Sequence, residues 1–158
     1  MRYEPCLHVV LHEPEIPPNT GNVGRTCVAI AAKMWLVRPL GFSLDDYYMR
    51  RAGLDYWEEL EWEVADDWPA LERRLEESGA GRKWLFSARA TRSYTSVDYR
   101  RGDVLVFGSE SKGLPDPLKA RYAESLLLIP SRPQVRSLNL SNSVAIAAYE
   151  ALRQWAGP

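Results

Sequence analysis

Short apolar runs recur along the chain, and each is bounded by polar or glycine-containing segments. Runs of this length between turn signals predict buried strands. We expect strands at residues 7–11, 34–37, 60–64, 83–87, 104–107 and 126–129.

Between these runs the apolar positions change to helical spacing. The last helix has the strongest pattern, because Val144, Ala148 and Ala151 recur three to four residues apart. Asp67, followed by Pro69, predicts a helix start, and Ser78–Gly79 its end. We also expect helices at 22–32 and 44–51, and an extended loop at Pro17–Pro18.

Strands that alternate with helices are typical of βαβ units. The sequence therefore predicts an α/β fold with a mainly parallel sheet flanked by helices. The pattern shows no repeat or linker, so we expect one domain over residues 1–158.

Composition narrows the function classes only slightly. With 158 residues, 46% hydrophobic and 26% charged, the chain is typical of a globular domain. A net charge of -1 neither favours nor excludes a nucleic-acid partner. Cys6 and Cys27 stand alone, and no apolar run reaches membrane-spanning length. We expect a cytoplasmic protein with reduced thiols, no membrane partner and no metal.

Three polar, glycine-containing segments carry the candidate chemistry: residues 19–25, 107–115 and 136–142. Each follows a predicted strand directly or within a few residues. Because ligands bind beyond the carboxyl ends of strands in open α/β sheets, we expect the three segments to form one site.

Other readings of these residues lack a necessary part. Gly21 and Gly24 miss the third glycine of a dinucleotide-binding turn, and Lys112 precedes Gly113 where a phosphate loop needs the reverse order. His8 and His12 share a strand face but have no third metal ligand at a recognisable spacing. No serine lies in a nucleophile elbow of the kind hydrolases use.

The order of the three segments, Asn-Thr-Gly-Asn-Val-Gly-Arg, Phe-Gly-Ser-Glu-Ser-Lys-Gly-Leu-Pro and Arg-Ser-Leu-Asn-Leu-Ser-Asn, resembles the SPOUT family of RNA methyltransferases. Residues 13–18 and 50–56 extend the resemblance over nearly the whole chain. It is closest to the small single-domain branch that methylates the 2′-hydroxyl of the tRNA wobble nucleotide.

The resemblance implies a C-terminal trefoil knot that forms an S-adenosyl-L-methionine pocket, with S-adenosyl-L-homocysteine as product. A knot is too rare for periodicity to suggest it. By position, the residues implied to line the pocket are Phe86, Ser87, Gly108, Ile129, Ser137 and Leu138. We expect Gly108 to leave room for the cofactor and the apolar side chains to cover adenine.

The resemblance also implies the catalytic residues, with Arg25 at the reacting hydroxyl and Glu110, Ser137 and Asn139 around it. Glu110 can fix a loop or pair with Arg25, and Asn139 can orient the ribose or hold Arg25. Ser137 and Asn139 are equally suited to cap the last helix.

The chain has no separate RNA-binding module, so the resemblance implies that the catalytic domain, as a homodimer, binds the tRNA anticodon loop. Candidate RNA contacts are Asn19, Arg89, Arg132 and Arg136, and Tyr149 is the candidate interface residue. Tyr56 and Trp57 can stack on bases or be buried.

The implied substrate is nucleotide 34, a cytidine or 5-substituted uridine, in leucine isoacceptors. Two alternatives stay open: methylation at another tRNA or rRNA position, and a catalytically silent RNA-binding protein.

Overall fold

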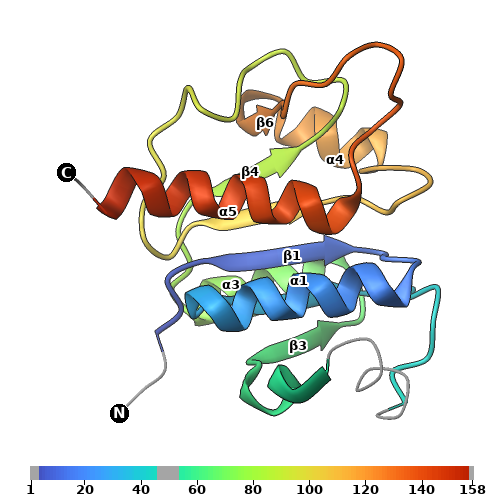
Figure 1. Ribbon diagram of the computed structural model, residues 1–158, viewed down its shortest axis with the longest axis vertical. Helices are drawn as coiled ribbons and strands as arrows, with labels where there is room; N and C mark the ends of the chain where they lie inside the picture. Colours follow the sequence, from blue (N-terminus) through green and yellow to red (C-terminus); the bar gives the residue numbers. More distant parts are fainter. Residues whose placement is uncertain (1–3, 46–53, 157–158) are drawn as a thin grey trace.

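The computed structural model describes residues 4–45 and 54–156 as a twisted sheet between two helical layers (Figure 1). The strand order is β3-β2-β1-β5-β4-β6, and every neighbouring pair is parallel. This confirms the predicted α/β class. The strands are β1 His8–His12, β2 Lys33–Val37, β3 Trp62–Ala65, β4 Lys83–Phe86, β5 Val104–Phe107 and β6 Leu126–Leu127.

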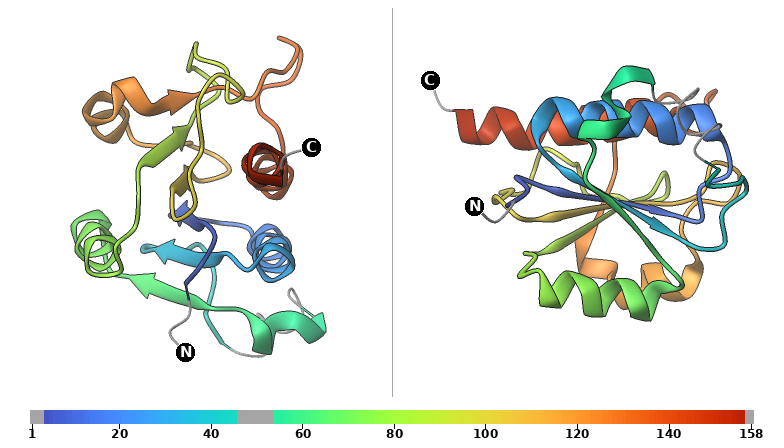
Figure 2. Two further views of the ribbon diagram at one scale, coloured as in Figure 1. Left: turned by 90° about the vertical axis from the view of Figure 1, so that its left-hand side faces the viewer. Right: turned by 90° about the horizontal axis from the view of Figure 1, so that it is seen from below.

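Helices cover both faces of the sheet. Helices α1 (Pro17–Ile30) and α5 (Leu140–Ala156) lie side by side on one face, and α3 (Trp68–Glu77) and α4 (Asp116–Arg121) lie on the other (Figure 2). Two short 3-10 helices, η1 (Leu54–Glu59) and η2 (Ala123–Ser125), precede β3 and β6. The sequence did not predict α4.

Strand β1 is a continuous buried run because helices cover both of its faces. Val9 and Leu11 pack in the core beneath α1 and α5, whereas Val10 packs in the core beneath α3 and α4. A strand covered on both faces needs no polar alternation. Burying each of these side chains contributes roughly 1.5–3 kcal/mol to the free energy of folding.

Helix α3 confirms its predicted boundaries. The Asp67 side chain accepts a hydrogen bond from Ala70 N at 2.8 Å, and Gly79 follows the helix with a φ of 72°. Trp68, Leu71 and Leu75 form its buried stripe. The cap satisfies one backbone N–H that has no acceptor within the helix.

The predicted start of the first helix was wrong. Pro17 and Pro18 form the first turn of α1 and not an extended loop. Proline is tolerated there because first-turn N–H groups have no acceptor within the helix. As a result, Asn19 lies in a helical turn. The predicted helix at 44–51 falls largely on residues 46–53, outside the described residues.

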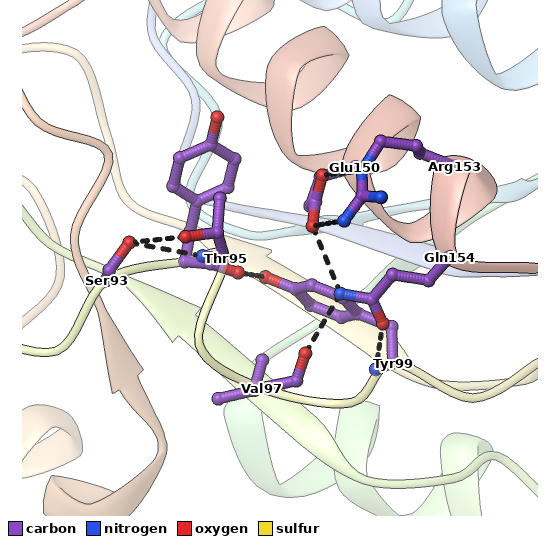
Figure 3. A network of polar contacts seen from close by, with 8 residues as sticks. Ser93, Thr95, Val97, Tyr99, Glu150, Arg153 and Gln154 are labelled. Carbon is purple, nitrogen blue, oxygen red and sulfur yellow. Dashed lines mark hydrogen bonds and ion pairs between the residues drawn. The ribbon is translucent and has the colours of Figure 1, made fainter.

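The connection from β4 to β5, residues 87–103, crosses the C-terminal segment. Leu128 N donates to Arg92 O at 2.7 Å, just after β6. Further along, the Gln154 side chain of α5 donates to Val97 O at 3.0 Å and accepts from Tyr99 N at 2.9 Å (Figure 3). Helix α5 also packs against β5, so the C-terminal segment contacts both the sheet and this connection.

The two histidines and the two cysteines lie in or beside the core. His8 and His12 are buried, and His8 Nδ1 accepts from Trp35 Nε1 at 3.1 Å. Cys6 and Cys27 are free thiols. Across residues 4–45 and 54–156, no group of three or more His, Cys, Asp or Glu side chains is placed to hold a metal ion. None of the helices in the same part of the chain has the length and apolarity that crossing a bilayer requires.

Candidate active site

The three polar segments meet at the carboxyl ends of the strands, as predicted. The first follows β1, the second begins at the end of the neighbouring strand β5, and the third runs from the loop after β6 into the start of α5. Hydrogen bonds made by side chains join all three, although up to 120 residues separate the partners.

Glu110 of the second segment binds the start of α1. One carboxylate oxygen accepts from Glu15 N at 2.9 Å. The other accepts from Ile16 N at 2.7 Å and from the Asn19 side chain at 3.3 Å. Hydrogen bonds to an ionised acceptor are stronger than neutral ones. Glu110 therefore fixes the first segment against the second.

Glu15 makes the reciprocal contact. Its carboxylate accepts from Ser111 N at 3.2 Å and from Ser111 Oγ at 2.5 Å. These bonds favour the ionised form, so the pKa of Glu15 lies below its ordinary value. The two glutamates thus clamp the segments from both sides.

Asn139 joins the third segment to the first. Its Nδ2 donates to Asn19 Oδ1 at 3.0 Å, while its Oδ1 accepts from Asn142 N at 3.2 Å and from Ser141 Oγ at 2.6 Å. Asn139 is therefore the cap of α5, one of the two roles expected for it. Arg136 joins the third segment to the second, because its guanidinium donates to Ser111 O at 3.1 Å.

Arg25 is exposed on α1, and its neighbours differ from those expected. Its guanidinium carbon lies 5.6 Å from the centroid of the Tyr56 ring. The Tyr56 hydroxyl donates to Gly21 O at 3.2 Å, which fixes the ring against α1. The sequence did not predict that Tyr56 contacts Arg25. The available signal was that Tyr56 ends the stretch 50–56, which shares the resemblance to the SPOUT family.

Two expected partners of Arg25 bind elsewhere. Glu110 forms no ion pair with Arg25, because the backbone of residues 15–16 and the Asn19 side chain occupy its carboxylate. Asn139 binds Asn19 and does not hold Arg25. Trp57 is 8% exposed and packs on Trp62, so its stacking on RNA bases is excluded.

The loop after β5 itself requires a glycine at position 108. A Cβ at this position would lie 2.2 Å from the carbonyl carbon of Gly113 and 2.3 Å from Leu114 N. The backbone of the same loop therefore requires that residue 108 has no side chain. Contact between Gly108 and the cofactor stays a prediction.

The other predicted pocket residues gather near the ends of β4, β5 and β6. Phe86 stacks on Phe107 with ring centroids 4.6 Å apart, and Ser87 N donates to Leu127 O at 3.1 Å. Ile129 and Leu138 are half-buried at the two ends of one segment. Within the described chain, residues 129–138 make one backbone–backbone hydrogen bond, from Val135 N to Arg132 O at 3.0 Å.

The remaining predicted residues are accessible. Ser137, Arg89, Arg132 and Arg136 are exposed near the same edge of the sheet. Tyr149 is 53% exposed on α5, and Ile146, one turn before it, is 37% exposed. Asn19, by contrast, is buried and bonded to Glu110 and Asn139, so its structural role is to join the segments.

Comparison with known proteins identifies the family of the chain. The family model described as SpoU rRNA Methylase matches residues 6–149. A tRNA (cytidine(34)-2'-O)-methyltransferase from Burkholderia pseudomallei is 47% identical over 94% of this chain and 95% of its own.

Solved structures agree. One that concerns the 2-OH methylation of C/U34 on tRNA has 47% identity and a TM-score of 0.89, covering 96% of this chain and 97% of its own. An AdoMet-bound rRNA methyltransferase from Sinorhizobium meliloti has 26% identity and a TM-score of 0.81, covering 97% of this chain and 61% of its own. These likenesses identify the knotted α/β SPOUT fold. The chain therefore belongs to the SpoU methylase family of SPOUT methyltransferases.

Proposed function

We propose that this protein transfers a methyl group from S-adenosyl-L-methionine to the ribose 2′-hydroxyl of tRNA nucleotide 34, a cytidine or 5-substituted uridine. The observation that carries the proposal is the interlocking of all three motif segments through Asn19, Glu110 and Asn139. The relatives at 47% identity, which are described by this chemistry, support the choice of substrate.

The residues near the ends of β4, β5 and β6 fit the donor. Segment 129–138 has half-buried apolar residues at its two ends, Ile129 and Leu138, and its backbone groups are largely free of backbone partners within the described chain. Such a segment can cover an adenine ring and bind its polar edge. Phe86, Ser87, Gly108 and Ser137 complete the proposed pocket. When bound, S-adenosyl-L-methionine supplies an electrophilic methyl group on a sulfonium, and S-adenosyl-L-homocysteine remains.

Arg25 is the proposed residue at the reacting hydroxyl. A guanidinium stays protonated in proteins, so Arg25 does not act as the base. It instead binds the adjacent phosphate and stabilises the developing alkoxide, while the proton leaves to phosphate or water. Tyr56 limits the orientations of its guanidinium. Holding the hydroxyl in line is itself a large part of such catalysis.

Glu110 and Asn139 act by position in this proposal. Their hydrogen bonds to the first segment keep the α1 arginine in a fixed relation to the loops that bind the donor. Ser137 lies at the exposed edge of the third segment, where its hydroxyl can reach the ribose.

The anticodon loop presents nucleotide 34 in a single strand, so no duplex has to open. Arg89, Arg132 and Arg136 are the proposed phosphate contacts, and the 2′-hydroxyl distinguishes RNA from DNA. We also propose a cytoplasmic homodimer in which the exposed Ile146 and Tyr149 of α5 contact the second copy. Light scattering should give the mass of a dimer, and a monomer at micromolar concentration would contradict this part.

The proposal is tested by incubating the protein with labelled S-adenosyl-L-methionine and total tRNA and mapping the methylated nucleotide. We expect label on the 2′-oxygen of nucleotide 34, in leucine isoacceptors above others. Label at another tRNA position, or only on ribosomal RNA, would replace the substrate; no label on any RNA would refute the activity.

Substitution of Arg25 by lysine tests the proposed role of the arginine. Lysine keeps the charge but loses the planar, bidentate group, so we expect kcat to fall by about 100-fold, close to 3 kcal/mol of transition-state stabilisation. Nearly full turnover at neutral pH would contradict a planar, bidentate role.

A further inference from the structure

The β4–β5 connection contains arginines and runs from the carboxyl ends of the strands, where the motif segments lie, to their amino ends. It leaves the carboxyl end of β4 at residue 87 and reaches the amino end of β5 at residue 103 (Figure 1). Arg89 and Arg92 lie on its first part, and Arg100 and Arg101 lie on its last part. Positive charge therefore follows one continuous segment away from the proposed active site.

The last part of the connection borders a cavity of about 580 Å³ at the amino ends of β4 and β5. Four exposed arginines line this cavity, and none of them forms an ion pair with a carboxylate of residues 4–45 and 54–156. We name it the arginine groove, formed by Arg82, Arg92, Arg100 and Arg101.

A buried carboxylate organises the floor of the groove. Asp103 is 3% exposed and accepts from Arg82 N at 3.0 Å, Arg100 N at 2.9 Å and Trp84 Nε1 at 3.0 Å. It thus binds the backbone of two groove arginines and leaves their guanidinium groups free of it. The guanidinium carbon of Arg82 lies 4.1 Å from the centroid of the Trp84 ring, which restricts its orientation.

The charge balance of the groove is positive. Its acidic lining residues are the exposed Asp98 and the buried Asp103, so four arginines minus two carboxylates leave two net positive charges. Guanidinium groups that form no ion pair with the described carboxylates are suited to phosphates, which they bind in a bidentate manner.

We infer that the arginine groove binds the sugar–phosphate backbone of the tRNA substrate outside the anticodon loop. The inference rests on the proposed function, which supplies the RNA. β4 and β5 have four residues each, and a strand rises ~3.3 Å per residue. The groove at their amino ends therefore lies about 13 Å from the motif segments at their carboxyl ends. A nucleic-acid duplex carries one negative charge per ~1.7 Å of its axis, so one bound stem offers several phosphates over that distance.

The test removes two groove charges without touching the floor. In Arg82→Ala/Arg100→Ala both backbone N–H groups still reach Asp103. We expect the affinity for full-length tRNA at ~100 mM salt to fall about tenfold, and the slope of log affinity against log salt to become shallower by about two. The control, Arg73→Ala/Arg121→Ala, removes the same charge from α3 and α4 and should leave both quantities unchanged.

A second measurement separates this inference from the proposed function. We expect the double variant to keep wild-type affinity for an isolated anticodon-loop oligonucleotide, wild-type heat of S-adenosyl-L-methionine binding and wild-type melting temperature. Failure of the wild type to methylate tRNA would refute the proposed function. The comparison of tRNA affinity between the wild type and the double variant would still test the groove.

Three results would overturn the inference. They are unchanged tRNA affinity and salt slope in the folded double variant, an equal loss in the Arg73/Arg121 control, and an equal loss with the anticodon-loop oligonucleotide. A wild type that does not bind tRNA at all would overturn it as well.

Discussion

The two ends of the parallel sheet each depend on one carboxylate that accepts three hydrogen bonds. At the amino ends Asp103 binds two backbone N–H groups and an indole N–H, and at the carboxyl ends Glu110 binds two backbone N–H groups and an amide. The chemistry is nearly the same, yet the two carboxylates hold different parts of the chain together.

Asp103 is almost fully buried, and its donors lie at most 21 residues away in the sequence. Glu110 is only half-buried, and its donors lie 91 to 95 residues away. A buried carboxylate with local partners stabilises the fold, whereas a half-buried one with distant partners fixes the relative position of functional segments. Loss of the first should therefore affect stability, and loss of the second should affect activity.

The largest effect is expected for Asp103→Ala. This change leaves three donors without an acceptor, one of them on a buried indole, and should lower the free energy of unfolding by about 4 kcal/mol. Urea denaturation measures it. Asp98→Ala, an exposed carboxylate on the same connection, is the control, with an expected change within about 0.5 kcal/mol. Equal losses of unfolding free energy in the two variants would show that the buried Asp103 stabilises the fold no more than the exposed Asp98 does.

The next effect concerns pH and compares the two ends of β1. Burial, followed by the Lys33 charge, lowers the pKa of His8 from 6.5 to about 4. Between pH 6.5 and 4 the unfolded chain binds the proton that the folded chain refuses, so stability falls as the pH falls. The lowered pKa of His8 corresponds to about 3 kcal/mol of stability, all of it lost once the pH is below about 4.

Chemical denaturation at several pH values measures this loss. His8→Gln can still accept from Trp35 and should flatten the pH dependence in that window. His12, at the other end of the strand, also has a lowered pKa through burial, so some slope remains in the variant. An unchanged slope in His8→Gln would show that His8 does not titrate as proposed.

The smallest free-energy effect is expected at the carboxyl ends, where activity should report it. Glu110→Gln replaces one acceptor oxygen by an NH₂ group that faces N–H donors. Weakening this tie by about 2 kcal/mol should lower kcat/KM by about 30-fold. We expect the melting temperature to change little, because the freed donors can reach water.

The control for this change is Glu76→Gln, which alters an exposed carboxylate of α3. It should keep wild-type kcat/KM and melting temperature. If Glu110→Gln instead unfolded the protein as readily as Asp103→Ala, the two ends would not differ in the way proposed.

Much of the fold could be predicted because its signals are local. Apolar runs gave the strands within a few residues, Asp67 and Gly79 marked the ends of α3, and the helical spacing of Val144, Ala148 and Ala151 gave α5. The position of the site also followed, since the carboxyl ends of parallel strands share one edge.

Other features had no local signal. Pro17 and Pro18 suit an extended loop and a first helical turn alike, and the surrounding structure decided for the helix. The sequence left the roles of Glu110 and Asn139 open between alternatives for the same reason, because the motif order does not say which side chain lies nearest to Arg25. The contacts of Tyr56 with Arg25 and of Glu15 with Ser111 arise because η1 and the Ser111 loop pack beside the start of α1 in the folded chain.

The strands, the main helices and the three polar segments follow from local patterns in the chain, because hydrophobic periodicity and capping act over a few neighbouring residues. Three features depend on the packed fold: the hydrogen bond between Asn19 and Asn139 across 120 residues, the close approach of the Gly113 backbone to Gly108, and the arginines at the amino ends of β4 and β5. Such contacts depend on which strands become neighbours in the sheet and on how the chain crosses itself, and no local pattern carries that information.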